Sequence, residues 1–135
     1  MAKLTGACLC DAVRFELNDE FQNFNFCHCK QCQRATGSAH ACNLFTSQDD
    51  FRWTQGEDRV RRYDVPGRAI SNAFCADCGS TLPYASRSGG AMIIPAGTLD
   101  ISPASELQPR HIFWSERANW FEEMSEAPRH ERCPA

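Results

Sequence analysis

The sequence predicts a single, mainly β domain, on the evidence of its length, its hydrophobic pattern and its cysteines. The chain has 135 residues, which is the size of one typical domain, and 42% of them are hydrophobic. Runs of alternating apolar and polar residues are short, and helical periodicity is weak throughout. Nine cysteines occur, most of them in tight groups. Grouped thiols of this kind indicate that metal, as well as an apolar core, holds the short strands together.

Alternating residues predict the individual strands. Val13, Phe15 and Leu17 alternate with polar neighbours, which is typical of a half-buried strand. A helical turn at residues 33–36, closed by Gly37, is expected after the central cysteines. Residues 128–135 have the composition of a loose tail, so we expect the domain to cover residues 1–127. Further strands are expected at residues 4–10, 24–26, 39–45, 51–53, 60–65 and 69–74, with a hairpin formed by residues 81–86 and 91–96.

The cysteine spacing predicts two zinc sites of different kinds. One tetrahedral zinc takes four thiolates, so two cysteine pairs can close a structural site that excludes substrate. Three further cysteines, spaced C-x-C-x-x-C, leave one position open, which is the arrangement of catalytic zinc. The outer pairs are Cys8/Cys10 and Cys75/Cys78, and the triplet is Cys27, Cys29 and Cys32.

The main alternative for so many cysteines is a disulfide framework. Such frameworks belong to secreted proteins, and residues 1–6 lack the apolar core of an export signal. An odd number of cysteines would also leave one thiol over, and C-x-C disulfides would be strained. We therefore expect a cytoplasmic zinc protein. No apolar run approaches the ~20 residues of a membrane span, and a formal charge of -3 disfavours a nucleic-acid surface.

The triplet leaves two functions open. If a fourth protein ligand closes it, the domain is a non-catalytic zinc module that binds a protein or peptide partner; His28, His40, Cys42 and His111 are the candidate ligands. If it stays open, it can bind water or a substrate thiol and lower the pKa of either. We expect the open site.

The expected surroundings of the triplet include three candidate catalytic residues. His40 and Cys42 lie two apart on a predicted strand, and a turn at Gly37 would bring their shared face toward the triplet. His40 is then a candidate for proton transfer. Arg34 and His111, with Lys30 and Arg110 as further cations, are candidates for protonating or anchoring a small anionic substrate.

Several motifs resemble those of the glutathione-dependent formaldehyde-activating enzyme family, which also includes centromere protein V. The resemblance runs from about Gly6 to Trp120, nearly the whole chain. The motifs are Gly6-x-Cys8-x-Cys10; Cys27-His28-Cys29-Lys30-Gln31-Cys32 running into Arg34-x-Thr36-Gly37-Ser38; Phe74-Cys75-x-x-Cys78-Gly79; and Pro109-Arg110-His111-Ile112 with Trp120.

The resemblance implies a fold of several coiled, mostly antiparallel sheets with two zinc ions. It implies that the outer pairs hold the structural ion. It also implies that glutathione and formaldehyde react at the triplet's ion to give S-hydroxymethylglutathione, which is the chemistry of a carbon–sulfur lyase. His40 departs from the pattern, because many relatives have an aromatic or other apolar residue at this position.

Overall fold

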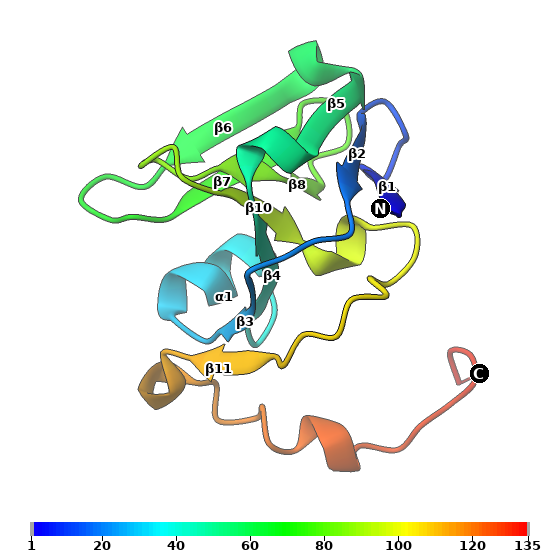
Figure 1. The fold of residues 1–135 in the computed structure, drawn as a ribbon. Helices are drawn as coiled ribbons and strands as arrows, with labels where there is room; N and C mark the ends of the chain where they lie inside the picture. Colours follow the sequence, from blue (N-terminus) through cyan, green and yellow to red (C-terminus); the bar gives the residue numbers. More distant parts are fainter. Residues whose placement is uncertain (1, 135) are drawn as a thin grey trace.

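Three small β-sheets form most of the computed structural model, which describes residues 2–134 (Figure 1). The first sheet has the antiparallel order β1 (Lys3–Ala7), β2 (Arg14–Asn18) and β5 (Phe51–Gln55). The third sheet has the antiparallel order β6 (Val60–Asp64), β7 (Ser71–Cys75) and β8 (Thr81–Leu82). The central sheet has the order β11 (Arg110–Ile112), β3 (Asn23–Cys27), β4 (Ala41–Thr46), β10 (Met92–Pro95) and β9 (Tyr84–Ala85).

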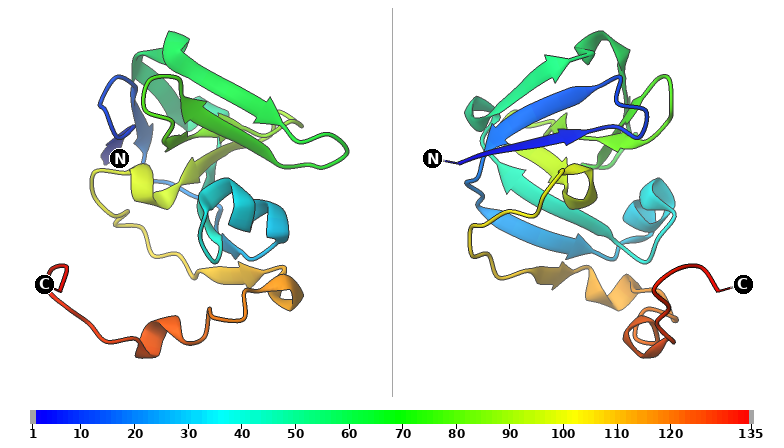
Figure 2. Two further views of the ribbon diagram at one scale, coloured as in Figure 1. Left: turned by 180° about the vertical axis from the view of Figure 1, so that it is seen from behind. Right: turned by 90° about the vertical axis from the view of Figure 1, so that its right-hand side faces the viewer.

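Short helices join several of these strands, and two more follow the last strand. The α-helix α1 covers Lys30–Thr36 and links β3 to β4. The 3-10 helices are η1 (Gln48–Asp50), η2 (Glu57–Arg59), η3 (Ala96–Thr98), η4 (Trp114–Glu116) and η5 (Met124–Glu126). The first and third sheets lie at one end of the molecule, whereas β11 and the C-terminal segment lie at the other (Figure 2). Within residues 2–134, no helix is long and apolar enough to cross a bilayer.

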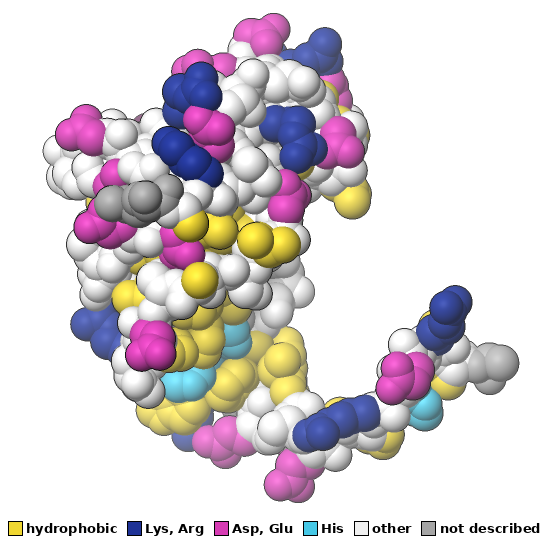
Figure 3. Space-filling model, turned by 45° about the vertical axis from the view of Figure 1, so that its right-hand side comes forward, with side chains coloured by type: hydrophobic (Ala, Val, Ile, Leu, Met, Phe, Trp, Pro, Cys, Tyr) yellow, Lys and Arg dark blue, Asp and Glu magenta, His cyan; other side chains and the backbone are white. Residues whose placement is uncertain are grey.

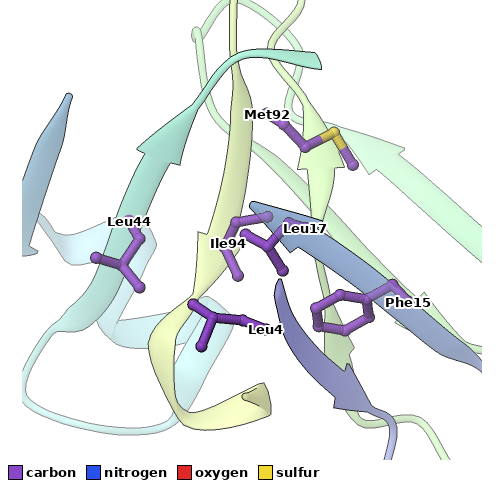
Figure 4. Close-up of a cluster of buried hydrophobic side chains, with 6 residues drawn as sticks. All are labelled: Leu4, Phe15, Leu17, Leu44, Met92 and Ile94. Carbon is purple, nitrogen blue, oxygen red and sulfur yellow. The ribbon is translucent and has the colours of Figure 1, made fainter. Parts of the chain in front are cut away.

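The main apolar core lies between the first and the central sheets (Figure 4). Strand β2 shows the predicted alternation, since Phe15 and Leu17 are buried and their neighbours are only partly so. The buried side chains of this core are Leu4, Phe15, Leu17, Leu44, Met92 and Ile94. A second cluster joins Cys8 and Val13 to Ala73, Cys75 and Leu82. One cysteine of each outer pair, Cys8 and Cys75, is therefore buried in this cluster, whereas Cys10 is exposed. A metal held by the outer pairs would link the first sheet to the third.

The mainly β prediction is confirmed, with three differences in detail. Helix α1 is longer than one turn because the Cys29 side chain caps it, accepting a bond from the Cys32 backbone N–H at 3.4 Å. It ends as expected at Gly37, which has φ +66°. The expected strand 81–86 is divided, because Pro83 has no N–H for the ladder: β8 pairs with β7, and β9 pairs with β10. Strand β11 was not predicted.

Candidate functional site

The outer pairs come together as one group of four thiols. All four Sγ atoms lie within 4.8 Å of one another. The separations are 3.7 Å from Cys8 to Cys10 and 3.9 Å from Cys10 to Cys75, far longer than the ~2.05 Å of a disulfide. All nine cysteines, each within the described residues, are free. This grouping matches a closed four-thiolate zinc site.

Backbone amides support the thiols of the outer pairs. The Val13 N–H donates to Cys8 Sγ at 3.3 Å, and the Asp77 N–H donates to Cys75 Sγ at 3.4 Å. Gly79 has φ +74°, and this tight turn lets its N–H donate to the Cys75 carbonyl at 2.8 Å. Hydrogen bonds from the Ser80 hydroxyl and backbone lower the pKa of the Cys78 thiol to about 6. Amides and hydroxyls aimed at sulfur stabilise thiolates, which is the form that binds metal.

The triplet forms a second, separate group at the junction of β3 and α1. Cys27 ends β3, Cys29 caps α1 and Cys32 lies in the first turn of the helix. Their Sγ atoms also lie within 4.8 Å of one another. A hydrogen bond from Cys32 lowers the pKa of Cys27 to about 6, whereas hydrogen bonding to Cys27 and burial raise the pKa of Cys32. Three thiols this close cannot all ionise unless a cation balances them, so the donor set fits a metal ion.

The four candidate fourth ligands lie on the opposite face of the central sheet: His111 pairs with Phe26, and His28 packs against His111 and His40. Register shows this, because directly paired residues share a face: Cys27 pairs with Ala41, whereas Cys42 pairs with Phe26. Cys42 and His40 do share a face, and their Sγ and Nδ1 atoms are 3.4 Å apart. The expectation that this face looks toward the triplet is wrong, because Ala41 and Asn43 occupy the triplet's side of β4. Within residues 2–134, the triplet gathers no fourth metal-binding side chain.

A cluster of histidines and aromatic residues packs behind the triplet. His28 is 0% exposed, and its Nε2 lies 2.8 Å from His111 Nδ1. Its ring contacts those of His40, Trp114 and Phe121, with centroids 4.8 to 5.1 Å apart. The His28 N–H also donates to the Ile112 carbonyl at 3.0 Å. Burial lowers the pKa of His28, which keeps the ring neutral. These contacts hold the loop between Cys27 and Cys29 in place from the face of the sheet opposite the triplet.

Figure 3 shows histidine side chains among apolar ones at the end of the body from which the C-terminal segment leaves. This C-terminal segment contacts helix α1 through hydrogen bonds made by Glu116 in η4. The Lys30 N–H donates to Glu116 Oε1 at 3.2 Å, and Gln33 Nε2 donates to the Glu116 carbonyl at 3.0 Å. Gln33 also donates to the His28 carbonyl at 2.9 Å. β11 and η4 thus hold helix α1, which carries the triplet, in place; we call this contact the clamp. It joins residues far apart in the sequence, so the spacing of the cysteines did not reveal it.

The triplet opens into a cavity of about 460 Å³. Its wall is mostly apolar, with Phe45 and Ile93 from the central sheet and Ile70 from the loop before β7. The two carboxamides of Asn25 and Asn43, which pair across β3 and β4, also line it.

Two charged residues of the cavity, Arg68 and Glu116, were missed by sequence reasoning. Gln31, with its amide oxygen turned to accept, receives hydrogen bonds from Arg68 Nε at 3.1 Å and Nη1 at 2.9 Å. In the sequence, Arg68 and Glu116 are marked only by their charge, and many surface residues are charged as well. Arg34, which was predicted to anchor substrate, lies exposed in the last turn of α1, outside the cavity lining among the described residues.

Comparisons with known proteins identify the family of the chain and a solved structure of similar fold. A family model described as glutathione-dependent formaldehyde-activating enzyme matches residues 3–117. The chain is also similar to a Rhodobacter sphaeroides protein of known crystal structure, with 25% identity and a TM-score of 0.60; the match covers 78% of this chain and 98% of that one. No functionally curated protein matches the chain at a significant level.

Proposed function

We propose that this chain, which belongs to the glutathione-dependent formaldehyde-activating enzyme family, is a zinc-dependent carbon–sulfur lyase that acts on a small thiol adduct. The family makes glutathione and formaldehyde the first substrates to try. The observation that carries the proposal is the triplet of thiols, which has no fourth protein ligand among the described residues and opens into a cavity of about 460 Å³.

The two groups of thiols would hold two zinc ions with different tasks. The outer pairs would hold a structural ion that no substrate reaches. Zinc bound by Cys27, Cys29 and Cys32 would lower the pKa of a substrate thiol and so supply a thiolate at neutral pH. The apolar wall would exclude water and hold the carbon atoms of the adduct, and Arg68, at the cavity's rim, would attract a substrate carboxylate.

The positions of His40, His111 and Arg34 in the structure change the roles that we propose for these three predicted catalytic residues. His111 and His40 would act from behind the sheet by holding the loop of the triplet, because their rings pack on that side. Arg34 would at most attract anions from the surface of α1. A direct catalytic role for any of the three stays a prediction. We also propose a cytoplasmic location, since nine free thiols suit a reducing compartment.

The test is the interconversion of ¹³C-formaldehyde and glutathione with S-hydroxymethylglutathione, followed by NMR exchange rates. The zinc-loaded protein should raise the exchange rate above the spontaneous rate, and Cys32→Ser, which loses the open site, should not. If wild type and Cys32→Ser both give the spontaneous rate, the lyase proposal is wrong. Detection of four protein ligands on the second zinc would instead favour the non-catalytic module.

A further inference from the structure

The carboxamide of Asn25 is held in one orientation beside the triplet. Asn25 lies on β3 two residues before Cys27, is 7% exposed and lines the cavity. Arg110, its partner on β11, donates to Asn25 Oδ1 from Nε at 3.1 Å and from Nη2 at 2.9 Å. A guanidinium group donates and never accepts, so the amide oxygen must face Arg110. The NH₂ group must then point the other way.

The NH₂ group of Asn25 is left without a protein partner among the described residues, in a residue that lines the cavity. The nitrogen donates to no protein acceptor among residues 2–134. If it were fully enclosed, it would be a buried atom without a partner, but the one such side-chain atom among these residues is His28 Nδ1. The Asn25 nitrogen is therefore in contact with cavity space. Residues two apart on a strand share a face and lie about 7 Å apart. Asn25 thus presents a fixed donor one step along the same strand from a thiol of the triplet.

We propose that the Asn25 side-chain N–H donates to the aldehyde oxygen of the substrate, and that Arg110 is its positioning residue. This inference rests on the proposed function. The thiol first loses its proton to solvent. Its sulfur then forms a bond to the carbonyl carbon, the C=O π pair moves to oxygen, and this oxygen takes a proton from water. Cleavage reverses these steps: the hydroxyl loses its proton, the C–S bond breaks and the thiolate leaves.

The donor is useful because negative charge grows on that oxygen during both directions of the reaction. A preorganised N–H aimed at the developing oxyanion in a site poor in water is worth far more than the same bond in solution. The guanidinium of Arg110 also polarises the amide through its oxygen, which strengthens the N–H as a donor. Arg110 Nη2 additionally donates to Asn23 Oδ1 at 2.9 Å, a contact that lies outside the cavity lining.

The chain offers a matched pair of variants. Asn25→Asp keeps the shape and the contact with Arg110 but replaces the cavity donor by an acceptor. Asn23→Asp makes the same change in charge at the other partner of Arg110, outside the cavity lining. We expect Asn25→Asp to keep both zinc ions and the wild-type melting temperature while its kcat falls about 100-fold. Asn23→Asp should keep its kcat within about threefold of wild type.

A second readout does not depend on turnover. In ¹⁵N-labelled, zinc-loaded wild type, the Asn25 side-chain NH₂ resonances should shift when formaldehyde is added to the glutathione-saturated protein, and not when glutathione is added alone. Arg110→Met should broaden these resonances and lower kcat, and Arg110→Lys, which can still donate to Oδ1, should recover part of the loss. Recovery by lysine distinguishes positioning of the amide from general damage.

The outcomes separate the two claims. Full activity of Asn25→Asp, or resonances that stay unmoved while the adduct forms, would overturn the role of Asn25 and leave the lyase intact. A wild-type protein that neither binds glutathione nor accelerates exchange would overturn the proposed function, and the role of Asn25 with it.

Discussion

Single positions show where the backbone comes too close for a side chain. A Cβ on Gly6 would lie 2.3 Å from Phe15 Cζ and 2.6 Å from the Thr98 carbonyl oxygen. We expect Gly6→Ala to lower the free energy of unfolding by about 1–3 kcal/mol, because the core must move to accept the methyl group. Gly97→Ala is the control, since its Cβ would meet nothing within 4 Å. Equal urea midpoints for the two variants would contradict this packing.

The bond between His28 and His111 is expected to support the triplet's metal. His111→Ala removes the partner of His28 Nε2 and loosens the loop between Cys27 and Cys29. Loss of such a support typically lowers metal affinity 10- to 100-fold. We expect a loss of about 10-fold or more for one zinc, measured by competition with a chelator, and no change for the other. His130→Ala, on the exposed tail, is the control; equal affinities in both variants would rule out the support.

His40 and Cys42 are expected to leave the ligand shell of the zinc untouched. Both side chains lie behind the sheet, as the pairing of Cys42 with Phe26 requires. Zinc X-ray absorption spectra of His40→Phe and Cys42→Ala should therefore match that of wild type. Loss of a nitrogen or sulfur scatterer in either variant would mean that the register of β3 and β4 is wrong.

At the scale of elements, the cavity wall predicts which aldehyde the proposed lyase would use best. Ile93 and Phe45 offer apolar surface that formaldehyde, with a single carbon, cannot cover. Burial of one methylene is worth ~0.8 kcal/mol, so KM should fall about fourfold for each methylene that the wall buries. We expect hexanal to have a lower KM than formaldehyde at saturating glutathione, and Ile93→Ser to weaken the preference. Equal KM values for hexanal and formaldehyde would mean that the apolar wall does not bury the carbon chain of the aldehyde.

The two parts of the C-terminal segment are expected to differ in their contribution to stability: β11 contributes to it, and the tail does not. β11 pairs with β3 and places Arg110 against Asn25 and His111 against His28. Residues 127–134, in contrast, form no helix or strand. Removal of residues 128–135 should leave the melting temperature unchanged within about 1 °C, because it exposes little apolar surface. Removal from residue 110 onward should lower the melting temperature and release one zinc. A stable, fully metallated protein after the longer truncation would refute the clamp.

Sequence reasoning worked where the information is local. Alternation located β2, and thiol spacing grouped the seven cysteines as the structure does. It failed where distant segments decide. The parallel pairing of β11 with β3 joins residues more than eighty apart, and no local pattern records it. The face of His40 was misjudged for the same reason: alternation shows which residues share a face, but the strand's neighbours decide where that face looks.

At the scale of the whole molecule, the outer pairs are expected to determine stability. They join the first sheet to the third, across more than sixty residues of chain. Structural zinc sites contribute on the order of 10 kcal/mol in apparent terms, so Cys78→Ser should give loosely folded, poorly soluble protein. Cys32→Ser should give a folded domain with one zinc fewer. Melting curves identical to wild type for both variants would reject this division.

The central claim is that one zinc is closed by four protein thiolates and the other is held by three. Zinc X-ray absorption of native protein that holds two zinc ions by native mass spectrometry tests it most directly. We predict an average of about 3.5 sulfur scatterers at ~2.3 Å per zinc, rising to about 4 when glutathione is added, because its thiolate takes the open position. An average of 4 before glutathione is added, or disulfides within the groups and no zinc, would contradict the account.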